Sequence, residues 1–133
     1  VVWLIDGDGS FQMSQAELST AVQEGANVKV AILNNSYLGM VRQWQELFME
    51  KRYASTALTG PDYVKIAEAH GIPAKRVTTP DEVYPAIEFA QETPGPVVLE
   101  FVVEKEDNVY PLVPAGADLD DMIRRPITRE PAS

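Results

Sequence analysis

Residues 1–10, VVWLIDGDGS, contain an apolar strand-like run that ends in a Gly-Asp-Gly turn around Asp8. A second apolar run, VKVAIL at residues 28–33, ends at Asn34-Asn35, and the amphipathic stretch between the runs is long enough for one crossover helix. A strand–helix–strand crossover brings the carboxyl ends of both strands to the same edge of a sheet, where ligands bind in open α/β folds. We therefore expect Asp8 and Asn35 to converge on one hard cation through oxygen ligands, as Mg²⁺ prefers.

Predicted strands and helices alternate along the whole chain, which indicates a parallel sheet with helices on its faces. The expected fold is a three-layer α/β/α domain, incomplete at its N-terminus because the chain opens in mid-strand. The core is expected over residues 1–103, and the apolar run 97–103 is typical of a strand covered on both faces. Residues 104–133 carry four prolines and no sustained period, so we expect a tail that lies over another surface.

The first predicted helix has a start signal and a stop signal. Ser14 is the expected N-cap, with Glu17 at the third helical position to complete a capping box. Met13 and Leu18 are spaced for a hydrophobic staple across that cap. Gly25 is the expected C-terminal stop.

The later elements follow from apolar spacing and from Gly and Pro signals. We expect a helix over 39–48, a loop over 51–60 and a helix that stops at His70-Gly71. A short strand over 75–77 is followed by a helix that starts at Thr79, with Pro80 at its first position and Glu82 completing a cap, and that ends before Pro94.

The composition limits the partners. Eleven basic and twenty acidic residues give a net charge of −9, which argues against nucleic acid and anionic membrane surfaces. No Lys or Arg occurs in residues 1–27, so an anionic ligand at the first turn would need a divalent ion and backbone N–H groups. There are no cysteines, and no apolar run approaches the ~20 residues of a membrane span.

Two other interpretations of the first turn stay open. Gly7 and Gly9 can simply supply a tight strand-to-helix connection. Alternatively the segment imitates an EF-hand calcium loop, although the sixth position holds Phe11 where that loop needs Gly, and an apolar strand precedes it. The liganding positions would be Asp6, Asp8, Ser10, Ser14 and Glu17.

Three longer segments resemble the large subunit of acetolactate synthase, a member of the thiamine-diphosphate superfamily of 2-oxo-acid decarboxylases and carboligases. They are IDGDGSFQMSQAELSTA (5–21), VKVAILNNSYLGMVRQWQELF (28–48) and NVYPLVPAGADLDDMI (108–123). The Gly-Asp-Gly and Asn-Asn motif is shared by many thiamine-diphosphate enzymes. GMVRQWQ and NVYPLVPAGA are more specific to acetolactate synthase, and the resemblance runs from Val1 to about Ile123.

The resemblance implies a role for each matching residue. Asp8, Asn35 and the backbone carbonyl of Tyr37 are the implied Mg²⁺ ligands, and Trp44 is the implied wall of the pocket for the second 2-oxo acid. No catalytic residue is assigned to this chain, because the activating glutamate of the family lies in a different domain. The implied cofactor-binding residues are Gly7, Asp8, Gly9, Ser10, Asn35, Leu38, Gly39 and Met40.

The implied activity is decarboxylation of pyruvate and carboligation to a second pyruvate or to 2-oxobutyrate, in branched-chain amino-acid biosynthesis. The implied cofactors are thiamine diphosphate and Mg²⁺, with FAD bound by a domain that nothing in this chain resembles. We expect a fragment of a larger bacterial, cytoplasmic, homo-oligomeric enzyme, with a possible small regulatory subunit, that is inactive alone. The alternatives are another thiamine-diphosphate decarboxylase or oxidase, and a non-catalytic α/β metal- or nucleotide-binding module.

Overall fold

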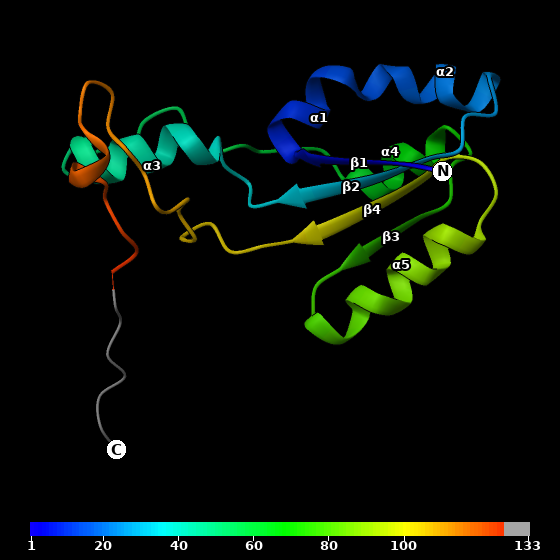
Figure 1. The fold of residues 1–133 in the computed structure, drawn as a ribbon. Coiled ribbons are helices and arrows are strands. Elements are labelled where there is room, and N and C mark those ends of the chain that lie inside the picture. Colours follow the sequence, from blue (N-terminus) through cyan, green and yellow to red (C-terminus); the bar gives the residue numbers. More distant parts are fainter. Residues whose placement is uncertain (127–133) are drawn as a thin grey trace.

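The computed structural model describes residues 1–126, and residues 127–133 of the expected tail lie outside that part. Four parallel strands form one sheet in the order β1-β2-β4-β3 (Figure 1). Their bounds are β1 Val2–Gly7, β2 Val28–Asn34, β3 Ala74–Val77 and β4 Val97–Val102. The parallel sheet confirms the expected α/β fold, and the strands lie where the apolar runs predicted them.

Helices cover both faces of this sheet, which gives the three layers expected from the alternating pattern (Figure 1). One face carries α1, α2 and α4, whose Phe11, Leu18 and Tyr63 pack on strand residues such as Ile32. The other face carries α5 over β3 and β4. The helices are α1 Asp8–Ser14, α2 Leu18–Gln23, α3 Gly39–Phe48, α4 Tyr63–Ala69 and α5 Val83–Glu92.

The start of the first helix was predicted wrongly. The helix begins at Asp8, directly after β1, and a 3-10 turn over Gln15–Glu17 joins α1 to α2. Ser14 therefore ends α1, and its side chain makes no capping hydrogen bond. The staple is also absent, because Met13 is 84% exposed.

The other end signals are confirmed. Gly25 adopts a left-handed φ of 60° at the end of α2, where a side chain would be strained. Thr79 and Glu82 form a capping box at the 3-10 turn Pro80–Glu82 that leads into α5. Among the described residues, no helix has the length and apolar character to cross a bilayer.

Helix α3 and the tail lie apart from the layers, beyond the carboxyl ends of the strands (Figure 1). The tail is tied to α3 by side chains of the helix: Gln43 donates to the Val109 carbonyl at 2.8 Å and accepts from its N–H at 3.0 Å. Arg42 donates to the carbonyl of Lys105 at 3.0 Å. The surface under this tail is therefore α3.

Candidate functional site

A cavity of about 380 Å³ opens at the carboxyl ends of β1 and β2. Its walls are the turn after β1, the loop after β2 and the first turn of α3. All eight residues predicted to bind the cofactor line it, and Tyr37 lines it as well. The lining residues are Gly7, Asp8, Gly9, Ser10, Leu33, Asn35, Tyr37, Leu38, Gly39, Met40 and Val41.

Asp8 supplies the only carboxylate among the lining residues, and no lining residue is basic. It is 3% exposed at the start of α1, and its backbone carbonyl accepts a hydrogen bond from the Tyr63 hydroxyl at 3.0 Å. Burial raises the pKa of the Asp8 carboxyl, while nearby backbone N–H groups, including those of Gly9 and Asn35, work to lower it. A buried carboxylate without a cationic side chain beside it suits a metal cation.

The loop after β2 is shaped by two successive asparagine turns. The Asn34 Oδ1 accepts from the Ser36 N–H at 2.9 Å, and the Asn35 Oδ1 accepts from the Tyr37 N–H at 3.0 Å. Ser36 has a left-handed φ of 58°, which is unusual for a residue with a side chain. The asparagines therefore fix the loop conformation as well as offering amide oxygens.

A second segment holds this loop from outside. The Leu38 N–H donates to the Thr56 carbonyl at 2.8 Å, and the Leu58 N–H donates to the Ser36 carbonyl at 2.8 Å. Leu58 also reaches the first turn, because a Cβ on Gly9 would lie 3.0 Å from its Cδ1. Residues 51–60, which were expected only as a loop, therefore contact both the loop after β2 and the turn after β1.

The start of α3 offers backbone N–H groups to the cavity. Leu38 occupies the N-cap position and provides no side-chain hydrogen bond to the helix. The free N–H groups at a helix N-terminus favour an anion such as a phosphate. A Cβ on Gly39 would lie 3.1 Å from the Asn35 Nδ2, so glycine keeps the helix start close to the asparagine.

Trp44 does not line this cavity. It lies one turn beyond Met40 on α3, is 39% exposed, and packs on Phe48 with ring centroids 5.1 Å apart. It is therefore a surface aromatic of this chain and not a core one. Its role toward a second 2-oxo acid stays a prediction.

The EF-hand interpretation is wrong. Residues Asp8–Ser14 form a helix directly after a strand, so the segment is not the calcium loop between two helices. Within residues 1–126, no group of three or more His, Cys, Asp or Glu side chains is placed to hold a metal ion. A metal at the cavity would therefore need amide and backbone oxygens beside Asp8.

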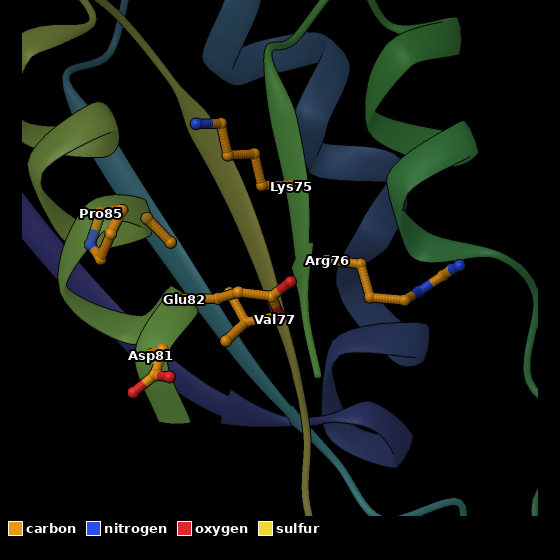
Figure 2. A pocket seen from close by; sticks show the side chains of 7 residues that line it. Lys75, Arg76, Val77, Asp81, Glu82 and Pro85 are labelled. Carbon is orange, nitrogen blue, oxygen red and sulfur yellow. The ribbon is translucent and has the colours of Figure 1, made fainter. Parts of the chain in front are cut away.

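A separate cavity of about 390 Å³ lies at the other edge of the sheet, between β3 and α5 (Figure 2). Val77, Pro85 and Ala86 contribute to its lining. The Lys75 Nζ lies 4.0 Å from the centroid of the Phe89 ring. None of the residues predicted to bind a cofactor or metal lines this cavity.

Sequence reasoning missed the residues that support the site from behind. Tyr63 holds the Asp8 carbonyl, and Glu100 is buried in β4 where it accepts from Asn34 Nδ2 at 2.7 Å. The signal for Glu100 was available, because a lone acidic residue interrupts the apolar strand VVLEFV. No comparable signal marked Tyr63.

Comparison with known proteins identifies relatives of the chain. The family described as "Thiamine pyrophosphate enzyme, C-terminal TPP binding domain" matches residues 1–101. The acetolactate synthase large subunit of Corynebacterium glutamicum is 49% identical over 127 residues, which cover 91% of this chain and 20% of the relative. The mitochondrial acetolactate synthase catalytic subunit of Saccharomyces cerevisiae is 48% identical over 119 residues, covering 90% and 17%.

Two solved structures of decarboxylases share the fold. Benzoylformate decarboxylase from Polynucleobacter necessarius superposes with a TM-score of 0.74 at 30% identity, over 81% of this chain and 20% of that one. The thiamine diphosphate-dependent 4-hydroxybenzoylformate decarboxylase of Rhodococcus jostii gives 0.72 at 26% identity, over 77% and 20%. The chain spans about a fifth of the length of the curated relatives it matches. It belongs to the thiamine pyrophosphate enzyme family, through the C-terminal TPP-binding domain of that family.

Proposed function

We propose that this chain is the diphosphate-binding domain of an acetolactate synthase catalytic subunit, which joins pyruvate to a second pyruvate or to 2-oxobutyrate in branched-chain amino-acid biosynthesis. The observation that carries the proposal is the cavity at the ends of β1 and β2, lined by every residue that the resemblance assigns to the cofactor. Identity of 46–49% to several acetolactate synthases supports this reaction over others of the family.

The residues present fit thiamine diphosphate with Mg²⁺. We assign the metal to the Asp8 carboxylate, the Asn35 amide oxygen and the Tyr37 backbone carbonyl, which share the cavity. The diphosphate would meet Gly9, Ser10 and the N–H groups at the start of α3. When bound, the cofactor supplies the chemistry for decarboxylation and for carbon–carbon bond formation. This chain contributes binding and orientation.

Gly9 and Gly39 lie where the cavity walls leave little room for a side chain. At Gly9 a Cβ would come within 3.0–3.1 Å of Leu58 and Leu38, and at Gly39 it would crowd the Asn35 amide. The lining holds no Lys or Arg, so metal and backbone N–H groups must neutralise the diphosphate. The buried Asp8 carboxylate completes a donor set of oxygens that Mg²⁺ accepts.

Trp44 is proposed to bound the site of the second 2-oxo acid. Its indole is partly exposed on α3, four residues after the cavity-lining Met40. One helical turn separates the two side chains, so they lie on the same face of the helix. An aromatic surface at this place would select the acceptor by size.

Several features of the proposal rest on the resemblance and on the short span of the chain relative to its relatives. We propose that a glutamate from another domain activates the cofactor, that FAD binds to a further domain, and that the chain alone is inactive. The working enzyme would be a homo-oligomer, with a possible small regulatory subunit, in the bacterial cytoplasm. The exposed apolar side chains of β1, with Ile5 70% and Val2 66% exposed, are consistent with burial against further protein.

The alternative is a decarboxylase that releases an aldehyde, which the likeness to benzoylformate decarboxylase favours. An assay of the full-length protein with pyruvate, with and without thiamine diphosphate, separates the two. We expect acetolactate that forms only with the cofactor. Acetaldehyde without acetolactate would establish the alternative, and no cofactor-dependent product would contradict both.

A further inference from the structure

A polar cluster centred on the buried Glu100 lies behind the cavity, on the face of the sheet that carries α4. Glu100, in the middle of β4, is 2% exposed. One of its carboxylate oxygens accepts from Asn34 Nδ2 at 2.7 Å, and the other accepts from Arg76 Nε at 2.8 Å. A buried carboxylate is costly without such partners, so each of its oxygens is committed to one donor.

The arginine side of the cluster is anchored to α4. Arg76 Nη2 donates to Asp62 Oδ1 at 2.7 Å, and Asp62 caps α4 by accepting from the Lys65 N–H at 3.2 Å. Figure 2 shows the Arg76 side chain directed away from α5 and its cavity. Because an arginine can only donate, it fixes one oxygen of Glu100 and leaves the other to Asn34.

The asparagine side of the cluster reaches the loop of the candidate site. Since the Glu100 carboxylate only accepts, Asn34 must turn its Nδ2 toward it and its Oδ1 toward the loop. That Oδ1 accepts from the Ser36 N–H at 2.9 Å and from the Ser36 hydroxyl at 3.2 Å. These two hydrogen bonds stabilise the left-handed backbone conformation of Ser36, which is strained for a residue with a side chain.

We propose that Glu100 is a positioning residue for the loop after β2, which contains the proposed metal ligands Asn35 and Tyr37. Through the amide of Asn34 it sets the turn at Ser36, and that turn places Asn35 and Tyr37 at the cavity. The inference rests on the proposed function, since the loop is assigned there to Mg²⁺. Residues behind metal ligands commonly change metal affinity about 10- to 100-fold when they are replaced.

Glu100→Gln tests whether Glu100 sets the orientation of the Asn34 side-chain amide, and it hardly changes the volume of the side chain at residue 100. The glutamine oxygen must face Arg76, so its Nε2 faces Asn34, where a second donor already points. Asn34 then has to turn its oxygen toward residue 100, which removes the acceptor from Ser36. Asn34→Ala deletes the same link at the other end.

The experiment measures Mg²⁺-dependent binding of thiamine diphosphate to the full-length protein by calorimetry. Each single variant should weaken binding about tenfold, and Glu100→Gln combined with Asn34→Ala should lose about the same tenfold because both break one link. Val98→Ala, two residues earlier on the same face of β4, is the control and should bind within about twofold of wild type.

A cofactor-free measurement gives an independent result. Hydrogen exchange at residues 34–38, relative to exchange in β1, should speed up in Glu100→Gln and not in Val98→Ala. Wild-type affinity in Glu100→Gln, losses that multiply in the double variant, or unchanged exchange at residues 34–38 would overturn the role of Glu100. If wild type itself binds no thiamine diphosphate with Mg²⁺, the proposed function fails first.

Discussion

Removing the Tyr63 hydroxyl should destabilise the domain through the first turn of the site. Tyr63 is 1% exposed, and its hydroxyl donates to the Asp8 carbonyl at 3.0 Å. Asp8 is the first residue of α1, so its carbonyl also accepts a hydrogen bond within the helix. Tyr63→Phe therefore removes one of two donors, which costs about 0.5–1.5 kcal/mol of the free energy of unfolding. The edge-on contact with Phe11, at 5.7 Å between ring centroids, is retained, so the loss reports the hydrogen bond.

Gly60 provides a matched test of this geometry. A Cβ on Gly60 would lie 2.9 Å from the Tyr63 hydroxyl oxygen but 3.4 Å from the nearest ring carbon. Gly60→Ala should therefore cost stability in the wild type and much less in Tyr63→Phe, with a coupling of about 1 kcal/mol in the double-mutant cycle.

Urea unfolding of this chain, followed by fluorescence and circular dichroism, measures all four proteins at one pH. The slope with urea should stay constant while the midpoint shifts. A Tyr63→Phe variant as stable as wild type would refute the reasoning, since the lost hydrogen bond should cost about 0.5–1.5 kcal/mol. Additive effects of the two substitutions would refute the predicted contact.

Three further substitutions test metal binding, the acceptor site and acid stability in turn. Burial raises the pKa of the Asp8 carboxyl, which means that the charged carboxylate is unfavourable in the folded chain. Asp8→Asn should therefore make the cofactor-free chain more stable in urea, and it should abolish Mg²⁺-dependent binding. A less stable variant would contradict the burial argument. Trp44→Leu in the full-length protein should shift the product ratio between competing pyruvate and 2-oxobutyrate while cofactor affinity stays the same; an unchanged ratio would remove Trp44 from the acceptor site. The Thr78 and Thr79 N–H groups lower the pKa of Glu82, so its stabilisation is present above its unfolded pKa and is lost as the pH falls through its lowered folded pKa. Glu82→Gln should flatten acid unfolding between those two pKa values, and an equally steep acid loss would contradict the cap.

Local signals in the sequence predicted the strands and most helix ends. The predicted helix 39–48 matches α3, and Thr79 with Glu82 form the expected capping box. These succeed because apolar spacing and capping act within a few residues. The prediction of a cap at Ser14 is wrong because the helix already begins at Asp8, so Ser14 lies at the end of α1.

The gathering of the cavity residues also follows from sequence, because parallel strands bring Asp8 and Asn35 to one edge. The residues that hold the cavity from behind do not follow from the sequence. Tyr63 lies 55 residues from Asp8, and Glu100 lies 66 residues from Asn34. Such pairs depend on how α4 and β4 pack, which no local pattern encodes.

The central claim is that Asp8 and Asn35 hold Mg²⁺ for the diphosphate of thiamine diphosphate. The most direct measurement titrates thiamine diphosphate into the full-length protein, with and without Mg²⁺, for wild type and Asp8→Ala. We expect wild type to bind only when Mg²⁺ is present, and Asp8→Ala not to bind in either condition. Binding of cofactor and Mg²⁺ by Asp8→Ala as tightly as by wild type would contradict the claim.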